Sequence, residues 1–166
     1  MKNFTYSLWL LVFCMISLTS CSKESIDEIE TADLSSTVAP FAYTTFEVEV
    51  LELVNDYRVE NGYSELDFMD AVSWQAEDHN AHMVAMNEVC HDDFGDRYAA
   101  LVATVQAKAV SENVAYGYRT AEAVVNAWIK SEGHRKNLEG NFTHFGISIT
   151  KNDEGKFYFT NIFVRK

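Results

Sequence analysis

Residues 145–164 read FGISITKNDEGKFYFTNIFV, and this stretch decides the fold class. Apolar and small polar residues alternate from Phe145 to Thr150, KNDEG at 151–155 has the composition of a turn, and large apolar residues recur from Phe157 to Val164. Two runs of period two around a turn predict a β-hairpin. The second strand is apolar on both of its faces, so it must be covered on both sides. This predicts a central sheet between two layers of helices.

Upstream of the hairpin, apolar residues recur at helical spacing and predict four helices. The first is capped by Thr44 or Thr45 and ends before Gly62, while the second spans about residues 70–88 and the third about residues 96–108. The fourth begins at Thr120 as its cap, and the residues just before it, 111–118, are expected to be extended or turned. The side chains expected to face the core are Phe46, Val50, Val54, Tyr57, Val72, Ala76, Met83, Met86, Leu101, Val102, Val105, Val124, Val125 and Trp128.

The first 43 residues are predicted to precede the folded domain, which we place at residues 44–166. A basic start followed by an apolar stretch over residues 4–16 is too short for a comfortable membrane span and is typical of a signal peptide, here residues 1–20. The sequence LTSC, ending at Cys21, resembles a bacterial lipobox, which predicts a lipid-anchored protein of the cell envelope; an ordinary signal peptide is the alternative. Residues 21–43 are acidic and rich in Ser and Thr, which predicts a flexible tether.

Charge and cysteine content exclude several classes of protein. The net charge is −12 and Lys and Arg are not clustered, so nucleic acid is not an expected partner. Once residues 1–20 are removed and Cys21 is acylated, Cys90 is the one remaining cysteine, so no intramolecular disulfide is expected. The neighbouring His91 raises the idea of a thiol nucleophile, but a small packed side chain is the favoured reading of Cys90.

Four short motifs stand in order before the hairpin. They are LVNDYR at 53–58, AEDH at 76–79 with Met83 and a later His91, SENVAYG at 111–117, and WIKSEGHR at 128–135. Each motif is weak alone, but four in this order resemble the short bacterial form of the CAP superfamily, the SCP-like or pathogenesis-related-1 type. The resemblance covers about residues 46–166. It implies an α/β (α+β) fold, a three-layer α-β-α sandwich with a small antiparallel central sheet.

The resemblance also implies a cleft lined by two histidines and two acidic residues. On this chain the histidines are His91 and His134, and the first acid is Glu112. The second acid falls at Ser131, so the chain departs from the four-residue set of the family. Glu132 is the adjacent substitute, although neighbouring residues usually point in different directions.

Two histidines and one carboxylate are an adequate ligand set for a divalent metal such as zinc, which makes His91, His134 and Glu112 candidate metal ligands. Without a metal, a His–Glu pair could orient one imidazole as a general base. No catalytic nucleophile is predicted, because no Ser or Thr lies in a nucleophile-elbow pattern. The structural alternative is that Glu112 ties a turn to backbone amides while the two histidines brace loops.

Structural roles are expected for other polar residues of the motifs. Arg58 is expected to form a local ion pair, and Asn55 is expected to have a structural role. His79 and His82 are three residues apart on one predicted helix and could be mistaken for a metal pair. We expect His79 to be a framework residue and His82 to lie at the surface.

Three functions from different classes fit these features. The favoured one is a secreted binding module whose cleft, at His91, Glu112 and His134, holds a small apolar, peptide or glycan ligand, with or without a divalent metal. The first alternative is a metal-assisted hydrolase acting on peptides or cell-envelope material, and the second is an interaction lipoprotein with a vestigial cleft. The fold alone cannot decide between them. The missing second acid and the lack of a nucleophile count against catalysis. We expect a monomer.

Overall fold

The structure, a computed structural model, describes residues 39–166. The predicted signal peptide, the lipidation site Cys21 and nearly all of the tether lie outside the described residues. Within residues 39–166, the helices are all too short or too polar to span a membrane.

A four-stranded sheet forms the middle layer, with the strand order β1-β3-β4-β2. β3 (His144–Lys151) and β4 (Phe157–Arg165) form the predicted hairpin, and β2 (Ala109–Tyr116) pairs antiparallel with the other side of β4. β1 (Asp67–Phe68) adds a two-residue parallel pairing to β3, so the sheet is mixed at one edge rather than wholly antiparallel. β4 is buried at every residue except its two ends, as its two apolar faces predicted.

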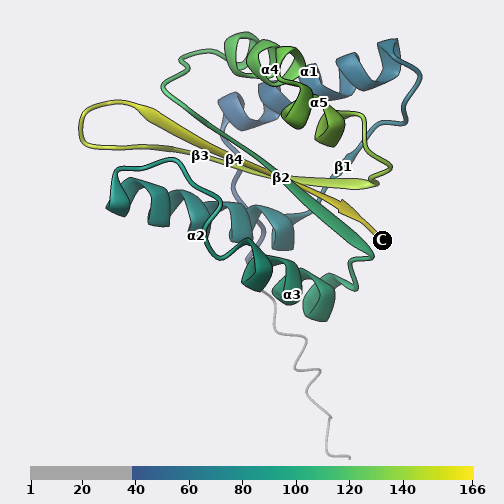
Figure 1. The fold of residues 1–166 in the computed structure, drawn as a ribbon, viewed down its shortest axis with the longest axis horizontal. Coiled ribbons are helices and arrows are strands. Elements are labelled where there is room, and N and C mark those ends of the chain that lie inside the picture. Colours follow the sequence, from purple (N-terminus) through teal and green to yellow (C-terminus); the bar gives the residue numbers. More distant parts are fainter. Residues whose placement is uncertain (1–38) are drawn as a thin grey trace, which may run out of the picture. The chain divides into compact units, whose positions relative to one another are not determined.

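Helices cover both faces of this sheet (Figure 1). α1 (Thr45–Glu60), α4 (Ala121–Lys130) and α5 (Glu132–Leu138) lie on one face. α2 (Asp70–Met86) and α3 (Phe94–Val105) lie on the other. The predicted α-β-α sandwich is therefore confirmed.

The start of α1 is tied both to its own first turn and to the sheet. Thr44 is the cap, because its hydroxyl accepts the Glu47 N–H at 3.3 Å while Glu47 Oε2 accepts the Thr44 N–H at 2.8 Å. The other carboxylate oxygen, Oε1, accepts the N–H of Ile149 in β3 at 2.8 Å. Ser73 Oγ accepts the N–H of Ile147 at 3.1 Å. Side chains from α1 and α2 thus accept hydrogen bonds from two N–H groups of β3 that are not bonded to any described strand.

Two residues that we expected to face the core are exposed instead. Met86 is 62% exposed because α2 ends there, at Asn87 in the left-handed conformation, two residues earlier than predicted. Val102 is 41% exposed, since Leu101, its neighbour on α3, takes the inward direction and successive helical residues lie about 100° apart. The fourth helix is capped by Thr120 as predicted.

The expected ion pair of Arg58 is wrong. Arg58 is 2% exposed, and its Nε donates to the carbonyl of Ser64 at 2.7 Å. Its Nη1 donates to the carbonyls of Leu138 and Gly140. Among the described residues no carboxylate forms a salt bridge with it. The guanidinium therefore links the loop after α1 to the end of α5 through backbone carbonyls.

Candidate functional site

Glu112 is the centre of a buried polar cluster. It lies on β2, and 7% of its surface is exposed. Arg97 of α3 donates two hydrogen bonds of 2.9 Å, from Nε to Oε2 and from Nη2 to Oε1. His91 Nδ1 lies 2.8 Å from Oε1, and His79 Nε2 lies 3.8 Å from the same oxygen. Both carboxylate oxygens are therefore engaged by side chains of the chain itself.

The protonation of Glu112 follows from these partners. Burial would raise its carboxyl pKa, but the hydrogen bonds from His91 and Arg97 and the charge of Arg97 outweigh burial and lower the pKa below its usual value. Glu112 is therefore an anion at neutral pH. Its charge is balanced by the bidentate guanidinium, the geometry in which Arg binds a carboxylate best.

We expect stability to fall in acid, for three reasons of the same sign. Burial lowers the pKa of His79 and of His134, so below the unfolded value of about 6.5 the unfolded chain takes up two protons that the folded chain refuses. The lowered pKa of Glu112 adds a further loss of stability. This loss begins below about pH 4.3 and continues as the pH falls through the pKa of Glu112 in the folded protein.

Urea unfolding at a series of pH values tests this expectation. The free energy of unfolding should be level above about pH 7 and fall by up to about 1.4 kcal/mol per pH unit for each proton taken up. His79→Gln should reduce the decline between about pH 6.5 and 5 to the part that His134 contributes, and leave the lower limb. A level profile down to about pH 5 in the unmodified chain contradicts the assignment.

The loop between α2 and α3 is fixed by the same cluster. His79 Nε2 lies 2.9 Å from the carbonyl of Cys90, and Arg97 Nη1 donates to the carbonyl of Asp92 at 2.7 Å. Between them, His91 is held by Glu112. Three successive residues of the loop are thus bonded to buried or nearly buried side chains, which gives their side chains defined positions.

The other predicted site residues lie at and around α5. His134 is half-buried, and burial, followed by the neighbouring His91, lowers the pKa of its imidazole. Ser131, at the position where the family resemblance puts the second acid, separates α4 from α5. Glu132 pairs with Lys136 at 2.8 Å, with 73% of its side chain exposed. Its carboxylate is therefore turned to solvent rather than replacing the missing acid.

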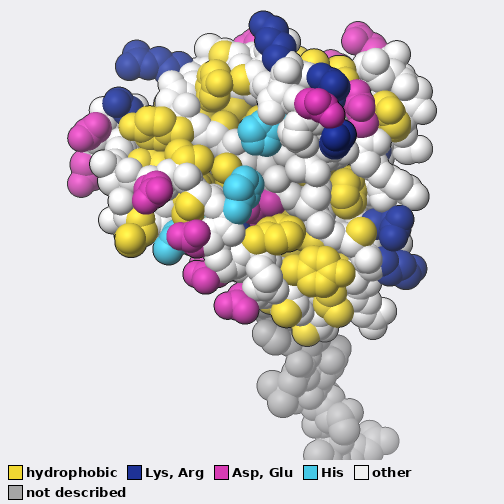
Figure 2. Space-filling model, in the orientation of Figure 1, with side chains coloured by type: hydrophobic (Ala, Val, Ile, Leu, Met, Phe, Trp, Pro, Cys, Tyr) yellow, Lys and Arg dark blue, Asp and Glu magenta, His cyan; other side chains and the backbone are white. Residues whose placement is uncertain are grey.

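Beside His91 lies a hollow of about 210 Å³, the His91 hollow, which is lined by His91, Phe94, Val110, Ser111 and Glu112. The His91 side chain is 53% exposed, whereas Glu112 beneath it is nearly covered. The Oγ of Ser111 is buried and has no hydrogen-bond partner among residues 39–166. Figure 2 shows two neighbouring histidine side chains in the middle of one face, with apolar and acidic side chains around them.

A divalent metal held by His91, His134 and Glu112 stays a prediction, and the structure does not favour it. Within the described part of the chain, these three residues do not bring their ligand atoms within 4.8 Å of one another. The guanidinium of Arg97 also lies 2.9 Å from Glu112, where a cation would have to compete with it. The donor set therefore fits an internal ion pair better than a metal centre, and we route no chemistry through a metal here.

Cys90 is half-buried against Met83 and Tyr158. Burial raises the pKa of its thiol, which opposes the thiolate that a nucleophile requires. The favoured reading, a packed side chain, agrees with this environment.

Two residues of the site were given no role from the sequence. Arg97 contributes a salt bridge and Ser111 an unpaired hydroxyl. His79, which we expected to be a framework residue, is buried and bonded to the carbonyl of Cys90. Ser111 directly precedes Glu112, the acid of the third motif, and this position is the sequence feature that could have identified Ser111. Arg97 had no comparable signal, because it lies outside the four motifs.

The fold and the four motifs define a known class of protein. The chain belongs to the CAP family, the cysteine-rich secretory protein family, whose sequence model matches residues 51–164. It is 34% identical over 121 residues to the uncharacterized protein YkwD of Bacillus subtilis (strain 168), covering 70% of this chain and 47% of that protein. It is 30% identical over 129 residues to the uncharacterized membrane protein YlbC of the same organism, covering 74% of this chain and 35% of that protein. The matched part is therefore less than half the length of either relative.

Solved structures share the fold. An outer surface protein from Borrelia burgdorferi has a TM-score of 0.68 at 17% identity, covering 77% of this chain and 98% of that one. An extracellular protein containing an SCP domain from Bacillus anthracis has a TM-score of 0.61 at 26% identity, covering 72% of this chain and 40% of that one. A cysteine-rich secretory protein from Staphylococcus aureus has a TM-score of 0.58 at 18% identity, with coverages of 72% and 38%.

Proposed function

We propose that this protein is a binding module of the cell envelope that holds the apolar end of a larger molecule in the His91 hollow. The observation that carries the proposal is the half-exposed imidazole of His91, which Glu112 holds at a hollow whose walls include the apolar side chains of Phe94 and Val110. Apolar walls with a few convergent polar groups are typical of ligand sites.

The imidazole of His91 forms the polar rim of this site. Its Nδ1 is taken by Glu112, which leaves Nε2 as the ring nitrogen available to a ligand on the exposed side. The Glu112 charge is already balanced by Arg97. The rim therefore favours a neutral hydrogen-bonding group, such as an amide or a hydroxyl, over a strongly charged one.

The size of the hollow limits what enters it. Its volume of about 210 Å³ is below the roughly 300–1,000 Å³ of pockets that enclose whole drug-sized ligands. It fits one apolar side chain or a short acyl segment. Of the ligand classes expected from the sequence, a peptide with an apolar residue suits the site best, because its backbone amides would meet the imidazole of His91.

A titration followed by the backbone amide NMR signals of residues 110–112 tests the proposal. The probes are an N-acetylated, C-amidated tripeptide with a central leucine, a medium-chain fatty alcohol and a chito-oligosaccharide. We expect the tripeptide to shift these signals in a saturable way. His91→Ala should weaken its binding by about 5–10-fold, the value of one hydrogen bond of about 1–1.4 kcal/mol.

Val102→Ala is the matched control, since Val102 is exposed on α3 and does not line the hollow, and it should bind like the unmodified chain. Saturation by the alcohol or the glycan alone would replace the peptide as the ligand class. If no probe saturates the signals, the remaining candidate is an interaction lipoprotein with a vestigial cleft. Cleavage of the tripeptide that is lost in His91→Gln would instead support the hydrolase, with His91 and Glu112 as base and orienting acid.

The location of the protein belongs to the same proposal. The names of its relatives include an outer surface protein, an extracellular protein and a membrane protein. We place this chain on the envelope through lipidated Cys21. Cys21→Ser should move the protein from the membrane to the soluble fraction, and unchanged retention in the membrane fraction would contradict the anchor.

A further inference from the structure

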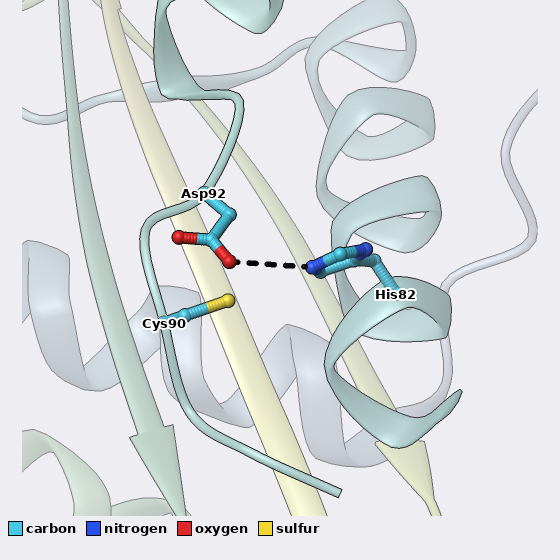
Figure 3. A group of neighbouring side chains, drawn as sticks. All are labelled: His82, Cys90 and Asp92. Carbon is cyan, nitrogen blue, oxygen red and sulfur yellow. Dashed lines mark ion pairs between the residues drawn. The ribbon is translucent and has the colours of Figure 1, made fainter. Parts of the chain in front are cut away.

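We propose that His82, Cys90 and Asp92, together the His82 cluster, bind one thiophilic divalent cation, with Zn²⁺ as the ion. One ligand atom of each residue lies within 4.8 Å of the other two. His82 projects from α2, while Cys90 and Asp92 come from the loop that leads to α3, and Figure 3 shows the three side chains directed toward a common space. This site is separate from the His91 hollow and does not depend on the proposed function.

The donor set favours zinc among the common divalent cations. Imidazole nitrogen, thiolate sulfur and carboxylate oxygen are the three ligand types that zinc takes in proteins, whereas magnesium and calcium prefer oxygen alone. Tetrahedral ligands placed about 2.0–2.3 Å from zinc lie about 3.3–3.8 Å from one another. His82 Nε2 and Asp92 Oδ2 lie 3.8 Å apart, so small side-chain adjustments would close the site around an ion.

An unsatisfied polar atom points to the same conclusion. His82 Nε2 is buried and has no hydrogen-bond partner among residues 39–166, although the carboxylate of Asp92 faces it. A separation of 3.8 Å is too long for a hydrogen bond and leaves the buried Nε2 without a partner. A cation between them would accept the Nε2 lone pair and the carboxylate together, which explains the geometry better than a surface ion pair does.

The two loop ligands are held in place before any ion arrives. The backbone carbonyl of Cys90 is bonded to buried His79, and the carbonyl of Asp92 to buried Arg97. His79 also stacks on His82, with ring centroids 5.9 Å apart and ring planes 12° from parallel. Fixed ligands lose little conformational freedom on binding, and such supporting contacts are characteristic of metal sites in proteins.

The surroundings allow a cation to approach. Asp92 is 69% exposed on its side chain and His82 36%, so the site opens to solvent. His82 also lines a hollow of about 330 Å³ whose other walls include three carboxylates against one guanidinium, that of Arg97, and the chain carries a net charge of −12. A concave surface of negative charge raises the local concentration of cations. The three carboxylates are those of Asp78, Asp93 and Asp96.

Binding must release a proton. The Cys90 thiol gives its proton to solvent when the sulfur bonds to the ion, so no oxidant or reductant takes part. Because this proton must leave, affinity should increase as the pH rises.

Titration of the metal-free, full-length chain with Co²⁺ tests the inference, because a cobalt–thiolate bond produces a charge-transfer band in the near ultraviolet. We expect this band to saturate at one ion per chain and to disappear when Zn²⁺ is added. Cys90→Ser should abolish the band. His82→Gln and Asp92→Asn should each weaken Co²⁺ binding by at least about 10-fold. Zn²⁺ should raise the melting temperature of the unmodified chain but not of Asp92→Asn.

Two matched histidine variants locate the ion. His144→Gln removes a histidine from β3, and His134→Gln removes a histidine of the family cleft; both should keep the band and the affinity. Asp92→Asn changes an exposed side chain, so its folding is preserved and loss of binding in it cannot be attributed to unfolding. Absence of a charge-transfer band, or a band lost in His134→Gln but kept in His82→Gln, would overturn the inference.

Discussion

Arg97→Met is expected to lower the free energy of unfolding by about 3–5 kcal/mol, the usual cost of removing one partner from a buried ion pair. Glu112 would keep its bond to His91 but lose both guanidinium bonds while 7% of its surface is exposed. The carbonyl of Asp92 would also lose its donor. Urea denaturation followed by circular dichroism measures the change. Arg119→Met, at an exposed arginine, is the control and should change stability by less than about 0.5 kcal/mol.

The double variant Arg97→Met/Glu112→Leu distinguishes the net contribution of the ion pair to stability from the cost of leaving Glu112 buried without its partner. A buried ion pair replaced by apolar residues of similar size often costs little, so the double variant should recover much of the loss. A loss of less than about 1 kcal/mol in Arg97→Met alone would mean that water or His91 compensates Glu112, and that the salt bridge is not the centre of the site.

Arg58→Met is expected to cost about 3–4 kcal/mol. The substitution removes the donor of three backbone carbonyls, those of Ser64, Leu138 and Gly140, and each buried acceptor left without a partner costs about 1–3 kcal/mol, with incomplete additivity. Thermal unfolding at neutral pH measures the loss. Arg58→Lys keeps the charge but cannot match the planar fork of donors, so an intermediate loss is expected. A Lys variant as stable as the original would show that charge, not the fork, matters.

Local patterns predicted much of the fold because they depend on neighbouring residues. The hairpin followed from alternation and a turn, and the caps Thr44 and Thr120 followed from residue type next to a helical run. Met86 and Val102 were misplaced because periodicity defines a helix face but not how much of that face another element covers.

The site could be predicted only as far as its motifs extend. His91 and Glu112 came from a family resemblance, and they are hydrogen-bonded at 2.8 Å. The partner that uses most of the Glu112 carboxylate, Arg97, lies 15 residues away in sequence and in no motif. Likewise, Arg58 pairs with carbonyls about 80 residues away, and backbone acceptors leave no trace in residue type. Long-range polar pairing is set by the fold, so sequence patterning could not supply it.

The side chains that accept hydrogen bonds from the edge of β3 affect how this domain avoids aggregation. Within residues 39–166, β1 pairs with only the first two residues of β3, and no described strand pairs with the rest of this edge, the kind of edge onto which a second molecule could add a strand. The start of α2 packs directly against it at Gly146. Glu47 and Ser73 already accept the N–H groups of Ile149 and Ile147, and an incoming strand would have to displace both. The carboxylate that begins α1 therefore also keeps neighbouring copies from joining their sheets, a protection of value wherever many copies are crowded on one surface.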